Sequence, residues 1–126
     1  MNTITITLPL PHKVLHPNGR TRHYGKRLRL TKSARTDAYY ASLAVLEGRQ
    51  PLWPAVVVQP TFYLARRMDG DGLAAWLKAY LDGAIQDAKI AHNDSAVVLL
   101  PPEQVTAKAA KGKREVVLVI TRVDQP

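Results

Sequence analysis

Cysteine is absent from this sequence of 126 residues. Its absence excludes disulfide bonds, thiolate metal sites and cysteine nucleophiles, and it is typical of proteins of reducing compartments. Long apolar runs are also missing, since no stretch approaches the roughly 20 residues that a membrane helix needs. Residues 1–13 lack the basic and apolar segments of a signal peptide. We therefore expect a cytoplasmic protein with no membrane partner.

Acidic residues are missing from the first 36 positions, which contain eight lysines and arginines. Over the whole chain, 18 basic and 10 acidic side chains give a net charge of +8 and an isoelectric point of about 10.1. Such a charge favours a polyanionic partner, most often a nucleic acid. The side chains that we expect to contact phosphates are Arg20, Arg22, Lys26, Arg27, Arg29, Arg66, Arg67, Lys108, Lys111 and Lys113.

Hydrophobic periodicity predicts elements in the order β-α-β-α-β-β. In chain order they are a strand over 3–8, a basic loop over 11–30, a helix over 31–48, a strand over 55–67, a helix over 73–84 and strands over 95–105 and 114–123. The sequence has no internal linker, repeat or low-complexity segment. We therefore expect residues 1–126 to form a single two-layer α/β domain (α+β), in which two main helices cover a mixed sheet.

Three local features refine this prediction. Thr31 or Ser33 is expected to cap the first helix, and Asp71 to cap the second. Pro60 lies inside the second strand, and proline there favours an edge strand or a β-bulge because it cannot donate a hydrogen bond.

Two aspartates one residue apart, Asp69 and Asp71, stand between the second strand and the second helix. If the strand extends to them, both side chains project to the same side, and such a corner can hold a hard divalent cation such as Mg²⁺. On a regular helix Lys78 lies within roughly 20° of Asp71 around the axis. Asp82 follows four residues later, where it can pair with Lys78. Asp94 precedes the next strand and can return to the same corner.

Each of these features has an ordinary explanation when taken alone. An Asp-x-Asp sequence is common in solvated loops and helix caps, and a Lys–Asp pair four residues apart is common on helix surfaces. Together, in a basic protein, they match the needs of phosphodiester cleavage: carboxylates hold a metal ion, and a cation neutralises the charge that develops on the phosphate. The combination favours a metal-dependent nuclease.

The segments "RRMDGDGL", "LKAYLDG" and "HNDSAV" resemble the motif of the RusA-type Holliday junction resolvases of phages and prophages. "ITITLPLPHK" and "LTKSARTDAYYASLAVL" are similar to the first strand and first helix of that family, so the resemblance covers nearly the whole chain as a single RusA-like endonuclease domain. It implies a homodimer that binds four-way DNA junctions and nicks two strands symmetrically in recombination and repair. The implied cofactor is Mg²⁺, or Mn²⁺ in its place, and the resemblance implies no small-molecule cofactor. It also implies that Asp69, Asp71 and Asp94 are catalytic metal ligands and that Lys78 is a catalytic lysine near the scissile phosphate.

Two departures from that motif leave alternatives open. Gly72 stands where the family has Asn, and Asn93 stands where the family has the first of two Asp residues. A protein on the same fold that binds branched DNA with weakened catalysis is therefore a second hypothesis. A third, an unrelated RNA-binding protein, rests on size and charge alone and leaves the aspartates unexplained.

Histidines and a tyrosine near these segments have two interpretations each. His12, His16 and His23 lie in the basic loop, either solvated or in contact with phosphate. His92 lies just before the last acidic motif and is a candidate for the metal corner. Tyr24 is expected either to pack the loop onto the domain or to stack on an unpaired base.

Overall fold

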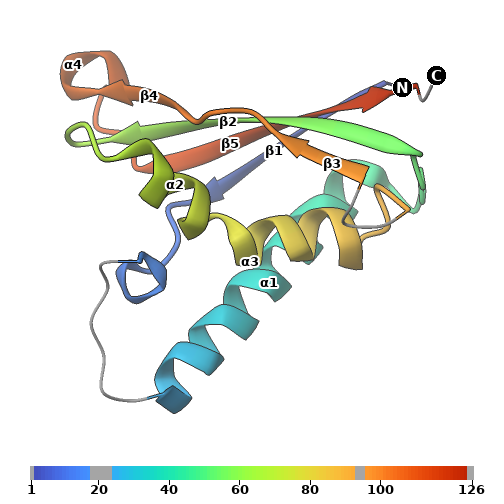
Figure 1. The fold of residues 1–126 in the computed structure, drawn as a ribbon, viewed down its shortest axis with the longest axis horizontal. Helices are drawn as coiled ribbons and strands as arrows, with labels where there is room; N and C mark the ends of the chain where they lie inside the picture. Colours follow the sequence, from blue (N-terminus) through green and yellow to red (C-terminus); the bar gives the residue numbers. More distant parts are fainter. Residues whose placement is uncertain (1, 18–23, 93–95, 125–126) are drawn as a thin grey trace.

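The structure is a computed structural model that describes residues 2–17, 24–92 and 96–124. A five-stranded mixed sheet is covered on one face by helices (Figure 1). The elements are β1 (Thr3–Pro9), the 3₁₀ turn η1 (Lys13–Leu15), α1 (Tyr24–Leu46), β2 (Ala55–Leu64), α2 (Gly70–Trp76), α3 (Lys78–Leu81), the π-helical segment η2 (Asp82–Asp87), β3 (Val97–Leu99), β4 (Glu103–Thr106), α4 (Ala107–Ala110) and β5 (Glu115–Val123). The predicted two-layer α+β class with a mixed sheet is confirmed.

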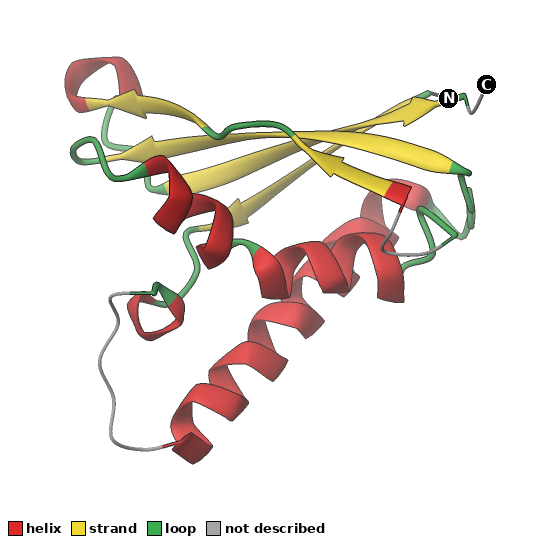
Figure 2. Cartoon of the chain, in the orientation of Figure 1, coloured by secondary structure: helices red, strands yellow, loops and turns green. Residues whose placement is uncertain are grey.

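The strand order places β2 at the centre of the sheet. β5 lies between β1 and β2 and is antiparallel to both, whereas β3 and β4 pair in parallel with successive halves of β2. The segment from α2 to η2 connects β2 to β3, so these two strands form a parallel crossover unit with its helices on the covered face (Figure 2). In open α/β sheets, ligands bind beyond the carboxyl ends of the strands. The aspartate pair follows that end of β2.

The hydrophobic core lies between the sheet and the helices. Side chains alternate between buried and more exposed along β1, β2 and β5, as the period-two sequence pattern predicts. The second helical segment contributes Leu73, Leu77 and Ala84, each fully buried. The strands contribute the largest share of the fully buried set, which includes Ile4, Ile6, Val56, Val58, Phe62, Val116, Leu118 and Ile120.

Helix α1 begins seven residues before the predicted start at Thr31, so the expected loop is wrong for residues 24–30. Thr31 is not a cap, because its hydroxyl donates to the carbonyl oxygen of Arg27 at 2.8 Å inside the helix. Lysine, arginine and leucine occupy residues 26–30, and all three are good helix formers. A helix without an apolar stripe has no periodic signal, and for this reason the pattern gave no indication of it.

The second predicted helix is divided into three parts. Leu77 interrupts it, and its N–H bonds to the carbonyl oxygen of Ala74 at 3.2 Å, a tight 3₁₀-type contact. After Asp82 the bonds become π-helical, as between the Ala88 N–H and the Gly83 carbonyl oxygen at 3.3 Å. The predicted apolar face is nevertheless confirmed, because burial repeats along all three parts.

Helix α1 packs very closely on η2. A Cβ atom added at Gly83 would lie 2.0 Å from the backbone oxygen of Arg35 and 3.1 Å from the Cβ of Ala38. The buried side of α1 is correspondingly small, with Ala34, Ala38 and Ser42 at intervals of four residues before Leu46. Small residues on both segments therefore fix the position of α1 against the second helical segment.

Pro60 lies in a central strand, so the predicted edge strand or bulge is wrong. Its position is in register with Leu118 on β5. The other side of β2 lacks a partner at this point, because β3 ends at Leu99 and β4 begins at Glu103. The Val58 carbonyl oxygen accepts the N–H of Leu100 at 2.9 Å. Backbone groups two residues apart in a strand point to the same side, so the backbone of Pro60 points to the same side as that of Val58. At Pro60 the neighbouring strand is interrupted, so the N–H that proline lacks has no partner to lose.

The remaining boundaries differ in detail. The strand predicted over 55–67 ends at Leu64, and the strand predicted over 95–105 is divided into β3 and β4. Within the described ranges, no helix combines the length and apolar character needed to cross a membrane.

Candidate active site

The two aspartates lie at the start of α2, beyond the end of β2. Asp69 is the N-cap residue, with extended backbone angles (φ −64°, ψ 128°), and its carbonyl oxygen accepts the N–H of Leu73 at 3.1 Å. Asp71 lies in the first helical turn, so its predicted role as N-cap is wrong. Both side chains are exposed, and both line the same hollow of about 510 Å³. The structure therefore brings the predicted pair together.

A glutamine from β4 holds the chain that leads into this corner. The side-chain amide of Gln104 donates to the carbonyl oxygen of Met68 at 2.8 Å and accepts the N–H of Met68 at 2.8 Å. These two bonds fasten the residue before Asp69 to the sheet, 36 positions away in sequence. The sequence analysis missed Gln104, because a single polar residue in a short strand carries no signal of such a contact.

The hollow continues along the helices towards Lys78. Ala74 borders both the hollow that contains Asp69 and Asp71 and a second one of about 340 Å³, which Lys78 and Asp82 line. The far walls are formed by the strand side, with Leu99 to Pro102 beside the aspartates and Val97 beside the lysine. We call these two adjoining hollows together the groove. It places the carboxylate pair at one end and the lysine further along the same wall.

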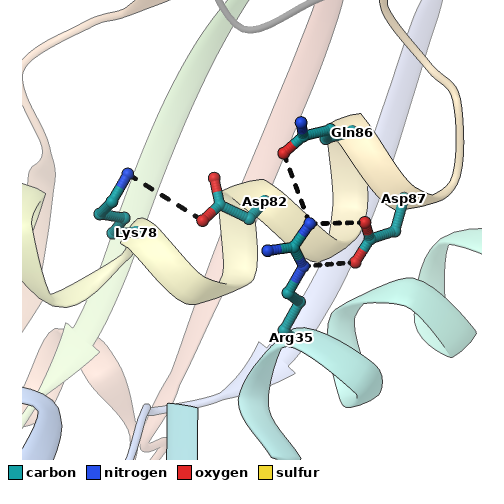
Figure 3. A network of polar contacts seen from close by, with 5 residues as sticks. All are labelled: Arg35, Lys78, Asp82, Gln86 and Asp87. Carbon is teal, nitrogen blue, oxygen red and sulfur yellow. Dashed lines mark hydrogen bonds and ion pairs between the residues drawn. The ribbon is translucent and has the colours of Figure 1, made fainter. Parts of the chain in front are cut away.

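Lys78 and Asp82 form the predicted pair on consecutive helical turns (Figure 3). The Nζ–Oδ2 distance is 4.0 Å, and the lysine side chain is 82% exposed. A pair this exposed contributes little to stability. The lysine is therefore available to an anion in the groove.

A second ionic contact ties α1 to η2. Arg35 donates from Nε and Nη2 to the two carboxylate oxygens of Asp87 at 2.6 and 2.7 Å, and reaches Gln86 at 3.5 Å (Figure 3). The hydrogen bond from Arg35 lowers the pKa of Asp87 below its usual value. The bidentate geometry fixes the relative rotation of the two segments.

Tyr80 anchors the same helical segment to the end of β1. Its hydroxyl donates to the carbonyl oxygen of Pro9 at 2.7 Å. Burial, with a smaller contribution from the charge of Asp37, raises the pKa of Tyr80 to about 12. The neutral phenol is therefore the form that the fold stabilises.

His16 occupies the space beside Gly72. A Cβ atom at position 72 would lie 3.0 Å from Nε2 of His16 and 3.1 Å from its Cε1. The His16 ring also meets Trp76 edge to face, with centroids 5.4 Å apart, and Trp76 donates to the carbonyl oxygen of His12 at 3.0 Å. His16 is therefore packed against α2 rather than solvated. The absence of a side chain at position 72 gives the ring room.

The expected phosphate contacts within the described residues lie in three sets: the first turns of α1 extend away from the sheet, and α4 lies at the end of the sheet opposite the chain termini (Figure 1). Lys26 and Arg29 are exposed on α1, whereas Arg27 is half-buried and donates to the carbonyl oxygen of Val14. Arg66 and Arg67 are exposed beyond β2. The third set is on α4 and the turn after it, where Lys108, Lys111 and Lys113 are exposed. Arg20, Arg22 and His23 lie outside the described residues.

Lys113 differs from the other two lysines of its set. Its Nζ lies 5.3 Å from the ring centroid of Tyr63, over the open face of the sheet. Such a cation–π contact positions the charge and leaves it accessible to solvent.

His92 does not approach the aspartates. Its N–H bonds to the carbonyl oxygen of Trp53 at 3.1 Å, beside the start of β2. The aspartates follow the other end of this ten-residue strand, which spans about 30 Å. Asp94 and Asn93 lie outside the described residues. Their described neighbours, His92 and Ala96, flank the start of β2, since Val97 pairs with Val56.

A divalent cation fits the donor chemistry of the corner. Among the residues that the structure describes, no three His, Asp or Glu side chains gather closely enough to hold a metal ion. Asp69 and Asp71 supply two carboxylates to one open hollow, which suits Mg²⁺ because this ion keeps several waters and needs few protein ligands. The corner therefore offers part of a coordination shell.

Comparison of the chain with known protein families finds no matching family, and comparison with curated proteins finds no significant match.

Proposed function

We propose that this protein is a metal-dependent endonuclease that binds four-way DNA junctions as a homodimer and resolves them by paired symmetric nicks. The observation that carries this proposal is the shared hollow of Asp69 and Asp71 at the carboxyl end of β2. Exposed carboxylates in a protein of charge +8 oppose DNA binding unless they hold a cation. The motif resemblance supports the junction as substrate, and a two-fold substrate cut in two strands calls for two related sites.

The side chains of the groove have separate tasks in this proposal. Asp69 and Asp71 would hold Mg²⁺, or Mn²⁺ in its place, and the ion supplies an activated water and charge neutralisation at the leaving oxygen. Gln104 keeps this corner in place through Met68. Lys78, further along the groove, contacts the phosphate and stabilises its developing negative charge. The motif resemblance also names Asp94 as a third ligand, but its described neighbours, His92 and Ala96, lie beside the start of β2 and not beside the aspartate pair.

The cationic elements support the binding step. Exposed lysines and arginines lie on α1, beyond β2 and around α4, and α4 is at the end of the sheet where β2 leads into α2 (Figure 1). Phosphate contacts of this kind set the position and salt dependence of DNA binding.

A branched-DNA-binding protein with weakened catalysis is the second candidate function. The glycine at position 72 favours it, because the asparagine of the resembled motif is missing and His16 lies close to where its side chain would begin. In this alternative the same surfaces bind the junction, and nicking is slow or absent.

The test is a comparison of Asp71→Asn with the parent on a synthetic four-way junction. We expect the variant to lose Mg²⁺-dependent cleavage and to bind the junction at least as tightly, because one negative charge is removed from the groove. Asp124→Asn is the matched control, since Asp124 is an exposed aspartate in the C-terminal segment, paired with Arg122. Equal cleavage by Asp71→Asn and the parent would refute the metal assignment, and absence of cleavage by the parent would favour the binding protein.

A further inference from the structure

The N-terminal part of α1 projects beyond the rest of the fold (Figure 1). None of the residues 24–33 is fully buried, and burial on this helix begins at Ala34. Ten helical residues extend over about 15 Å. This projecting end is held at its base by the bond from Arg27 to Val14 and by the close packing at Gly83. It is therefore a fixed feature of the surface.

Two large apolar side chains are exposed on this projecting end. Tyr24 is 75% and Leu28 is 52% exposed. They lie four residues apart, and residues at this spacing lie on the same face of a helix. Lys32 lies one turn further along the same side of the helix, Lys26 and Arg29 are exposed elsewhere around these turns, and residues 24–36 contain no acid. A single exposed apolar residue is ordinary, but an apolar pair within a cationic surface indicates a binding role.

The face that carries this pair borders a hollow next to the groove. Thr31, three residues after Leu28, lines a small hollow of about 180 Å³ together with Lys78 and Asp82. Residues three and four apart share a helix face. Leu28 and then Tyr24 therefore lie further out on the side of α1 that borders this hollow, and Lys78 and Asp82 line both the hollow and the groove.

We propose that Tyr24 and Leu28 contact unstacked bases at the branch point of the DNA. This contact rests on the junction binding proposed above and adds the feature that distinguishes a junction from a duplex. Base faces are covered in a continuous duplex and become accessible where strands part. An aromatic ring stacks on such a face and an apolar side chain wedges beside it, whereas the cations around them hold the adjoining phosphates.

Charge complementarity selects this occupant over a second copy of the chain. A two-fold contact between two copies of this end of α1, which carries Lys26, Arg29 and Lys32 and no acid, would bring like charges together, which is unfavourable. DNA supplies the negative charge that the surface lacks.

The test compares the parent with Tyr24→Ala, Tyr24→Phe and Leu28→Ala on a junction that carries 2-aminopurine at the branch point, and on linear duplex of the same sequence. EDTA is present, so that binding is measured without cleavage. Tyr40→Ala is the matched control, because Tyr40 is 64% exposed on the same helix and lies about 160° around the axis from Tyr24.

We expect Tyr24→Ala to lose about 10-fold in junction affinity, the size of one base–aromatic stack, with duplex affinity unchanged. Leu28→Ala should lose less, and Tyr24→Phe and Tyr40→Ala should match the parent. The parent should change the 2-aminopurine fluorescence on binding, and Tyr24→Ala should not.

Three results would overturn this inference. They are unchanged junction affinity in both alanine variants, an equal loss on junction and duplex, and a change of oligomeric state in Tyr24→Ala. Failure of the proposed nuclease gives a different pattern. A parent that binds junctions through Tyr24 and does not cut them in Mg²⁺ refutes the enzyme and retains the base contact.

Discussion

Gly83→Ala tests how the groove is built, because this glycine sets the distance between α1 and η2. The new Cβ would lie 2.0 Å from the backbone oxygen of Arg35, whereas ordinary contacts begin near 3.4 Å. The two segments must therefore separate locally by about 1.4 Å. Backbone cannot move aside as a flexible side chain can, so the cost falls in the upper part of the range for overpacking.

We expect Gly83→Ala to lower the free energy of unfolding by about 2–3 kcal/mol. This value is the net loss, after the higher helix propensity of alanine has offset up to about 1 kcal/mol of the strain. A net loss of this size lowers the melting temperature by about 5–10 °C in a domain of this size. Urea unfolding followed by the fluorescence of the buried Trp53 and Trp76 measures it.

Gly25→Ala is the matched control for this substitution. Gly25 is also helical, on the projecting end of α1, and a Cβ there meets nothing within 4 Å. We expect it to be neutral or stabilising by up to about 1 kcal/mol. A Gly83→Ala variant as stable as the parent would show that the position of α1 does not depend on close packing at this point. It would then be wrong that this packing fixes α1 against the second helical segment.

Two further predictions concern residues that hold the site in place. Gln104→Leu removes both bonds to Met68, and we expect the cleavage rate to fall about 10- to 100-fold with junction affinity unchanged; an unaltered rate would exclude a positioning role. Tyr80→Phe removes the bond to the Pro9 carbonyl oxygen and should lower the free energy of unfolding by about 1 kcal/mol at neutral pH. Because the pKa of Tyr80 is about 12 in the folded state and 10.0 without the fold, the parent should lose stability as the pH rises through this window. Urea unfolding of both proteins across it should show a shallower decline in the Phe variant, and identical slopes would contradict the pKa shift.

Local sequence patterns predicted the features that depend on near neighbours. Alternation of threonine and isoleucine located β1, and the spacing from Leu73 to Ala84 located the apolar face of the second helical segment. The pair of Lys78 and Asp82 also follows from helix geometry. The break at Leu77 did not disturb it, because the pair lies wholly beyond the break.

The features that the sequence did not predict depend on distant contacts. Pro60 is tolerated in a central strand because the neighbouring strand is interrupted. Gln104 holds Met68 across 36 positions. The early start of α1 had no periodic signal, since its first turns pack on little of the core. These are tertiary effects, which a local pattern does not contain.

The same limit applies to His16. His16 follows η1 and Gly72 lies in α2, so the two residues in contact are 56 positions apart in sequence. An asparagine at position 72 would therefore require the His16 ring to shift by a few tenths of an ångström.

The most direct measurement of the central claim is a denaturing-gel assay of the purified protein on a four-way junction labelled on each strand in turn. Linear duplex of the same sequence is run beside it, with Mg²⁺, with Mn²⁺ and with EDTA. The account predicts paired nicks at symmetric positions near the branch point, present only with metal and absent from the duplex. Junction binding without cleavage in either metal, or equal cutting of the duplex, would contradict it.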